Sequence, residues 1–138
     1  MAKTNAIFEY PILIREHHLD TFGHVNNAKY LEIFEDARWE LISQNGFALE
    51  EIHKKQIGPI VLGVEVHFKK ELRVREEINV TTQCTSFEGK IGKLLQKMIK
   101  KNGEEACLAT FTFGLFDFKT RKLIPPTPDW FKAIGLTP

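Results

Sequence analysis

The sequence lacks the features that mark several large classes of protein. It has no run of about 18 consecutive apolar residues, so we expect no membrane-spanning helix, and its first residues contain no apolar stretch that suits a signal peptide. Its charges nearly cancel, with 19 basic against 18 acidic residues and a net charge of +1, whereas nucleic-acid-binding proteins usually carry a basic excess. We therefore predict a cytoplasmic protein that binds neither a membrane nor a nucleic acid.

Cysteine, tyrosine and tryptophan are also scarce, with two of each. Cys84 and Cys107 lie far apart in apolar segments without CxxC spacing, which predicts two reduced thiols in the core rather than a disulfide or a zinc site. Phenylalanine, in contrast, occurs eleven times. It predicts an apolar interior or an apolar slot, for which the candidates are Phe22, Phe34, Phe111, Phe113 and Phe116.

The 138 residues, 43% hydrophobic and 27% charged, suit a single domain with one core, which we place at 1–138. Apolar residues alternate over 7–18, recur at helical spacing over 28–44, and alternate again from residue 58 to residue 118. The long helix is apolar on most sides, so we expect the sheet to wrap around it. A turn at Asn102-Gly103 favours hairpins between the later strands, and 128–134 suits a short helix. The predicted fold class is α+β, a curved antiparallel sheet around one long helix.

The reactive side chains concentrate in residues 17–30, where the first strand ends and the helix begins. A helix N-terminus offers unpaired N–H groups and a partial positive charge, which suit a developing oxyanion. Asp20 precedes the helix by about seven residues, across a turn that Gly23 can fold tightly. A carboxylate and a set of N–H donors on one carbonyl are the minimum equipment for acyl transfer or hydrolysis.

This segment resembles a known signature. The pattern Asp20-x-x-Gly23-His24-Val25-Asn26-Asn27-x-x-Tyr30, followed by Glu35-x-x-Arg38, is similar to that of hot-dog acyl-CoA thioesterases of the 4-hydroxybenzoyl-CoA thioesterase-like group. The resemblance covers nearly the whole chain and implies the hot-dog fold. It departs from the family at His18, where members usually carry an acid, at 71–77, where many have a Pro-x-x-x-Gly-Asp turn, and near Gly89–Gly92, where a serine is often found.

The resemblance implies a role for each matching residue. Asp20 is the catalytic carboxylate, as nucleophile or as general base on water, and the N–H of Asn27 holds the thioester oxygen. His24 and Asn26 position water or the thioester, while Gly23 and Tyr30 help to form the substrate site. From the residues alone, Asp20 also suits a turn, the two asparagines suit helix caps, and His24 suits a structural hydrogen bond.

Two further groups are candidates. Glu35 and Arg38 are three residues apart and can pair along one helix face; if the helix is enclosed, we expect them as a buried structural pair. A coenzyme A ester carries phosphate charges, for which the basic candidates are Lys69, Lys70, Arg73, Lys90, Lys93, Arg121 and Lys122. Of these we select Lys69, Lys90 and Arg121.

Other chemistries compete with hydrolysis. His18-x-Asp20 supplies two ligands of a metal triad whose third ligand is His24 or His67, and Cys84 or Cys107 with His67 is a candidate nucleophile pair. A hydratase acting on an acyl thioester needs an Asp and a His about five residues apart, against four here. A non-catalytic module that binds an acyl thioester or a lipid is the remaining alternative.

We predict a thioester hydrolase that needs no metal or other cofactor and acts on an acyl-CoA or an acyl carrier protein thioester. An unpaired edge strand tends to associate, and the resemblance implies dimers with sites between subunits. We therefore expect a homodimer or a homotetramer.

Overall fold

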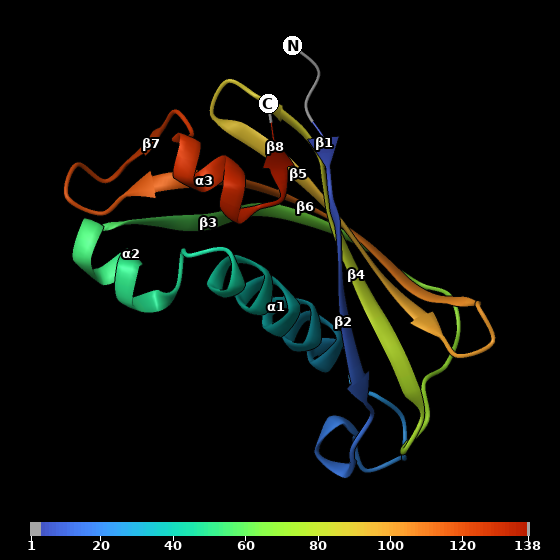
Figure 1. Cartoon of the computed structure of the whole chain (residues 1–138). Helices are drawn as coiled ribbons and strands as arrows, with labels where there is room; N and C mark the ends of the chain where they lie inside the picture. The colour runs from blue at the N-terminus through green and yellow to red at the C-terminus, as the bar shows by residue number, and fades with distance from the viewer. Residues whose placement is uncertain (1–3, 138) are drawn as a thin grey trace.

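The computed structural model describes residues 4–137, so the predicted domain ends at 1 and 138 lie outside the described residues. A five-strand path crosses the molecule in the order β2 (Ile7–Leu13), β4 (Glu77–Glu88), β5 (Ile91–Lys100), β6 (Glu105–Asp117) and β3 (Ile57–Phe68), all antiparallel. The short strand β7 (Lys122–Ile124) pairs with the end of β6. One long helix, α1 (Asn27–Gln44), lies under the concave face of this sheet (Figure 1). This is the α+β hot-dog architecture that the sequence predicted.

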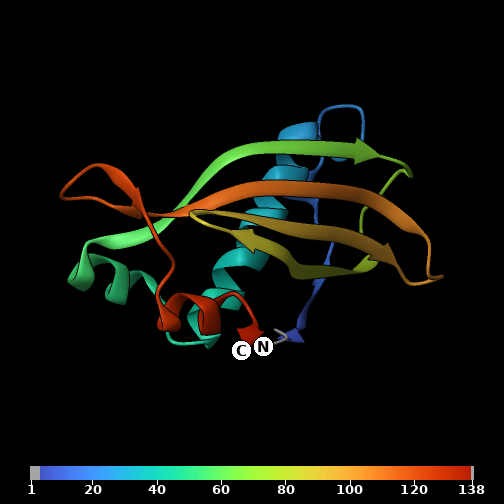
Figure 2. The ribbon, with the colours of Figure 1, turned by 90° about the horizontal axis from the view of Figure 1, so that it is seen from above.

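The remaining elements close one end of the molecule. The helices α2 (Leu49–Lys55) and α3 (Pro128–Ala133) lie beyond the C-terminal end of α1. The strands β1 (Thr4–Asn5) and β8 (Leu136–Thr137) pair with each other, so the first and last strands of the described chain lie side by side in both views (Figures 1 and 2). The helix predicted at 128–134 is confirmed, whereas α2 has no counterpart in the sequence prediction.

Helix α1 matches its prediction closely because both ends carry clear signals. Asn26 caps the start with its side chain, and the chain leaves the helix at Asn45 and Gly46. Its inner face places six residues against the sheet at helical spacing: Tyr30, Ile33, Phe34, Ala37, Leu41 and Ile42. The outer face is exposed and carries Leu31, Glu32, Glu35, Asp36, Trp39 and Glu40. The sheet therefore packs against the inner face of α1, in agreement with the predicted fold, and the outer face is exposed in the described chain.

One strand prediction needs correction. The first strand ends at Leu13, and residues Glu16–His18 form a short 3-10 helix instead of continuing the strand to 18. The connection from β3 to β4 is not a hairpin, because β3 pairs with β6 and forms the edge of the sheet. The hairpins β4–β5 and β5–β6 are confirmed. Consequently, β3 is brought beside α1 at a position that sequence order alone does not reveal.

Candidate active site

A tight hairpin turn carries Asp20 to the start of α1. The N–H of Asp20 donates to the His24 carbonyl at 2.8 Å, and the N–H of Gly23 donates to the Asp20 carbonyl at 3.1 Å. Leu19 and Val25 pair across the turn as an isolated bridge. Gly23 has φ +81°, a backbone conformation that side chains with a Cβ rarely adopt. The predicted role of Gly23 in folding this turn is confirmed.

The Asp20 carboxylate is held by the same turn. Its Oδ1 accepts hydrogen bonds from the backbone N–H groups of Phe22 at 2.9 Å and His24 at 3.2 Å. Within residues 4–137, no hydrogen bond to its Oδ2 is found. The carboxylate is half-buried. Asp20 therefore fulfils the turn role that its residue type suggested, and it still has one oxygen available for chemistry.

The helix N-terminus provides a hydrogen-bond donor at the same cavity as Asp20. Asn26 is the N-cap, and its side-chain oxygen accepts from the N–H of Ala28 at 2.8 Å. The next two N–H groups, of Lys29 and Tyr30, donate to the Asn26 carbonyl. Among the described residues, no acceptor is found for the N–H of Asn27. Asn26 thus proves to be a cap, and Asn27 presents a free backbone donor at the positive end of the helix.

A cavity of about 350 Å³ collects these groups. Its wall consists of Asp20, His24, Val25, Asn26, Asn27, Tyr30, Phe68 and Glu71. The structure therefore brings together five of the residues selected from the sequence: Asp20, His24, Asn26, Asn27 and Tyr30. The sequence reasoning missed Phe68 and Glu71, which come from the end of β3 and the loop after it; the alternation over 60–68 identified the strand but not its position next to the helix.

The side chains around the cavity make contacts of their own. His24 Nε2 lies 3.1 Å from a carboxylate oxygen of Glu71, and both side chains are largely exposed. The Tyr30 and Phe68 rings meet edge to face with centroids 5.0 Å apart. Burial is the main cause that raises the pKa of Tyr30 above its ordinary value, so its phenol stays protonated and is able to donate a hydrogen bond.

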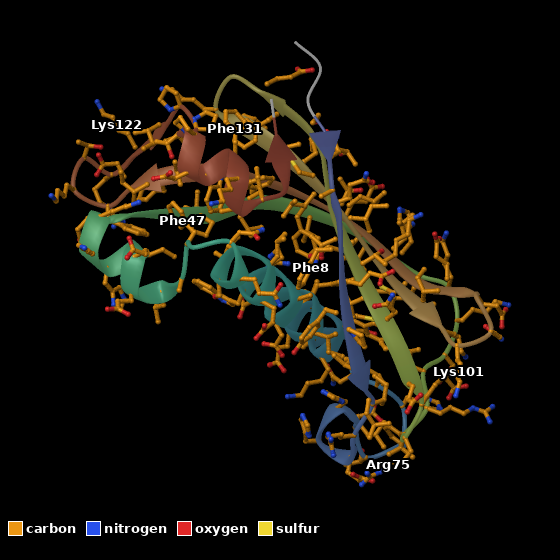
Figure 3. The ribbon with its side chains drawn as sticks, in the orientation of Figure 1. Phe8, Phe47, Arg75, Lys101, Lys122 and Phe131 are labelled. Carbon is orange, nitrogen blue, oxygen red and sulfur yellow. The ribbon has the colours of Figure 1, made fainter. Side chains whose placement is uncertain are left out.

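The three basic residues selected for coenzyme A binding do not meet in one chain. Lys69 directly follows Phe68 and binds Glu105 at 2.7 Å. Lys90 and Arg121 lie at the other end of the sheet, where β5 and β7 pair with the last residues of β6. Figure 3 shows the neighbouring Lys122 at that end, far from Arg75, which binds Glu16 close to the Asp20 turn. Along β6, roughly 25–30 Å separate Lys69 from Lys90 and Arg121 at the usual rise of a strand.

The expected pair of Glu35 and Arg38 does not form. Among the ion pairs of the described residues none joins them; Glu35 is exposed, and Arg38 is partly buried. Arg38 Nη1 donates instead to Gln96 Oε1 at 3.0 Å, and its guanidinium lies 4.2 Å above the centre of the Phe111 ring. Burial lowers the pKa of Arg38 from its ordinary value, while nearby Glu35 acts in the opposite direction. The pairing failed because the helix is open on its outer face.

Arg38 belongs to a second cavity, of about 330 Å³, between α1 and the sheet. Its wall is mainly apolar: Leu41, Ile42, Pro59, Ile60, Val61, Leu94, Phe111, Phe113, Trp130 and Ile134, with Glu35, Arg38 and Trp39 beside them. Of the five phenylalanines proposed for an apolar slot, only Phe111 and Phe113 line this cavity. Phe34 is buried against Phe111, and Phe22 is 84% exposed at the hairpin tip.

The alternative chemistries gain no geometric support. Within 4–137, no three His, Cys, Asp or Glu side chains come together in a way that could hold a metal ion, and His67 instead contacts Glu65. Both cysteines are buried. Burial raises the pKa of the Cys107 thiol to about 11, which leaves it protonated at neutral pH and a poor nucleophile. None of the helices that the structure describes is long and apolar enough to cross a membrane.

Comparison with known proteins agrees with the fold and with the family that the sequence resembles. The chain is 31% identical over 114 residues to the long-chain acyl-CoA thioesterase FadM of Escherichia coli strain K12. The aligned region covers 82% of this chain and 86% of FadM. The crystal structure of YbaW, a probable thioesterase from Escherichia coli, matches with a TM-score of 0.81 and 26% identity over 92% of this chain and 98% of that one. The DHNA-CoA thioesterase of Staphylococcus aureus matches with a TM-score of 0.79 and 26% identity over 94% and 87%.

The family assignment rests on the whole domain rather than on the motif alone. The sequence model of the thioesterase-like superfamily matches residues 14–134, a range that contains the Asp20 turn, α1 and the strands β3 to β7. This chain is a member of the thioesterase-like superfamily.

Proposed function

We propose that the protein is an acyl-CoA thioesterase that uses Asp20 as its catalytic carboxylate. The observation that carries this proposal is the cavity whose wall contains both Asp20, with one carboxylate oxygen unbonded, and Asn27, with a free backbone N–H, among the described residues. The activity of the relative FadM, named as a long-chain acyl-CoA thioesterase, supports the same substrate class.

The chemistry follows from the two groups. The carbonyl oxygen of the thioester accepts a hydrogen bond from the Asn27 N–H, so the helix N-terminus stabilises the oxyanion as it forms. Asp20, held through Oδ1, acts through Oδ2 as a general base: it takes a proton from water while the water oxygen bonds to the carbonyl carbon. The C–S bond then breaks, and the proton passes to the departing thiolate. Direct attack by Asp20 on the carbonyl carbon is the alternative first step: the C–S bond breaks as the thiolate leaves, and a mixed anhydride forms. Water then cleaves this anhydride, which gives the free acid, restores the Asp20 carboxylate and supplies the proton that the thiolate takes.

We further propose a homodimer that pairs through β3. This strand is one of the two edges of the described sheet and exposes apolar side chains at Val61, Leu62 and Val64. Antiparallel pairing of two β3 strands would place the Ile57 end of one beside the Phe68 end of the other. Lys90 and Arg121 of one protomer would then approach the Asp20 cavity of its partner, where they suit the phosphates of coenzyme A.

The deciding experiment measures thiol release from a panel of short, long and aromatic acyl-CoA esters. Asp20→Asn is the informative variant, because an asparagine oxygen can keep the two backbone hydrogen bonds of Oδ1 while the base is lost. We expect kcat/KM to fall by at least about a hundredfold, with an unchanged melting temperature. Asp129→Asn, at an exposed carboxylate on α3, is the matched control and should retain full activity.

A fall of only a few-fold in Asp20→Asn would overturn the catalytic role of Asp20. Binding of acyl-CoA without turnover of any ester would favour the non-catalytic binding module. Turnover of acyl carrier protein thioesters alone would change the thiol carrier and leave the chemistry of Asp20 in place.

A further inference from the structure

The apolar cavity contains a charged group that the proposed chemistry does not use. Arg38 is part of its wall, whereas the Asp20 cavity lies at the opposite end of α1. A partly buried guanidinium beside apolar side chains costs free energy unless its N–H groups find acceptors. The Arg38 guanidinium therefore needs hydrogen-bond acceptors from the protein or from a ligand.

The fold holds this guanidinium in a fixed position. Gln96 is fully buried and donates both amide hydrogens, to the Phe34 carbonyl at 3.1 Å and to Thr82 Oγ1 at 2.9 Å. Its side-chain oxygen therefore faces Arg38 and accepts a hydrogen bond from Arg38 Nη1 at 3.0 Å. Thr82 and Gln96 are the two polar side chains that are fully buried in the described part of the chain, and both belong to the network that positions Arg38.

Most of the hydrogen-bonding capacity of Arg38 is unused. A guanidinium has five N–H donors, and one of them meets Gln96. No carboxylate of residues 4–137 lies within ion-pair distance of Arg38. Because Arg38 is part of the cavity wall, its remaining N–H donors are available to a ligand in the cavity. The planar fork matches the geometry of carboxylates and phosphates, and of these two groups a carboxylate is the one that ends an oxidised acyl chain.

The distance from the Asp20 site suits a long acyl chain. Eleven residues separate Asn27 from Arg38 along α1, which corresponds to about 16 Å of helix. An extended peptide residue spans about 3.6 Å over three backbone bonds, which is about 1.2 Å per bond. At the same advance per bond, an acyl chain needs roughly 13 bonds to cover this length. On the side of β3 that faces α1, Val61 lines the apolar cavity, Phe68 lines the Asp20 cavity, and the exposed Val64 lies between them in the strand. These apolar side chains offer a path for the acyl chain.

We propose that the apolar cavity binds the far end of a long acyl chain and that Arg38 there binds a terminal carboxylate. The preferred substrate is then the mono-thioester of a long-chain dicarboxylic acid. This inference rests on the proposed function, because it places the thioester end of the same molecule at Asp20 and Asn27. Arg38 is a specificity-determining residue in this scheme and takes no part in the bond-breaking step.

Binding tests the inference without any turnover. Both tryptophans of the chain, Trp39 and Trp130, are in the wall of the cavity, so intrinsic fluorescence should report its occupation. We expect tetradecanedioic acid to bind at least tenfold more tightly than tetradecanoic acid. Arg38→Met should remove this difference, because the methionine retains the apolar stem and loses the fork. Arg38→Lys should restore part of it.

Kinetics provides the second readout. In the wild type, kcat/KM for tetradecanedioyl-CoA should exceed that for tetradecanoyl-CoA, and Arg38→Met should lower only the former by at least tenfold. Glu35→Gln should raise activity toward the diacid ester, since it removes a negative charge from the same cavity wall.

The outcomes separate this inference from the proposed function. Equal losses on both esters in Arg38→Met, or equal affinity of the wild type for the two free acids, would overturn the role of Arg38 while the thioesterase stands. Hydrolysis of neither ester, together with tighter binding of the diacid, would support the cavity and overturn the proposed reaction.

Discussion

The two cavities on α1 have nearly equal volumes, about 350 and 330 Å³, and opposite chemistry. The Asp20 cavity lies at the helix N-terminus, where backbone N–H groups lack partners within the helix. The Arg38 cavity lies beside the later turns, where the helix satisfies its own backbone and only side chains define the surface. One is suited to polarising a carbonyl, and the other to selecting what is attached to it.

The two cavities also differ in how they are supported. Short-range backbone hydrogen bonds of residues 18–26 hold Asp20 at the surface. Arg38 depends on Gln96 and Thr82, which come from β5 and β4 and lie in the core. Disturbing the first cavity should therefore affect activity more than stability, and disturbing the second should affect both.

The largest effect on stability is expected from Gln96→Leu. This change leaves Arg38, Thr82 and the Phe34 carbonyl without their buried partner, and we expect the free energy of unfolding to fall by about 3 kcal/mol. Urea denaturation measures the loss. Adding Arg38→Met should recover part of it, because a neutral side chain needs no acceptor, and the coupling should exceed about 1 kcal/mol. Strict additivity of the two changes would contradict the network.

A smaller loss of stability is expected at acidic pH, and it should arise at His18, next to the Asp20 turn. The pKa of His18 is lowered mainly by burial. The positive charges of His17 and Lys29 lower this pKa further, whereas Asp36 acts in the opposite direction. The neutral ring accepts the Arg15 N–H through Nδ1 at 2.9 Å. Because the folded-state pKa is depressed, this contribution to stability is complete above the ordinary value of 6.5 and is lost as the pH falls through the folded-state pKa.

Unfolding in urea at a series of pH values between about 7 and 5 tests this dependence. His18→Asn places a non-titrating oxygen near the position of Nδ1, so its stability should vary less steeply with pH. An equal slope in the two proteins would show that another group is responsible.

The smallest effect is expected from Glu71→Gln. The His24–Glu71 contact is exposed on both sides, so the free energy of unfolding should change by less than about 0.5 kcal/mol. We expect kcat/KM to fall less than tenfold, because the residue orients His24 and does not touch the carbonyl. A loss as large as that of Asp20→Asn would move Glu71 into the catalytic machinery.

Much of the Asp20 cavity was predictable because its residues are close in sequence. A cap, a glycine turn and a carboxylate within ten residues are local signals, and local backbone geometry turns them into a site. The contribution of Phe68 and Glu71 was not predictable, because it depends on β3 pairing with β6 at an edge of the sheet, which places its Phe68 end against Tyr30 of α1.

The prediction for Arg38 failed for the same kind of reason. Spacing of three residues allowed a pair with Glu35, but the preferred partner is Gln96, 58 residues away. Lys90 and Arg121 were chosen for their charge, and only the strand register shows that they lie at the other end of the sheet.

The sequence by itself determined the elements and the reactive turn. Hydrophobic periodicity, caps and turn residues act over a few positions, so they specify the long helix, the later strands and the meeting of Asp20 with a helix N-terminus. Only the tertiary structure decided which strand lies beside the helix, which partner holds Arg38 and where the apolar cavity lies. Those features depend on contacts between residues far apart in the chain, and strand order and register fix them.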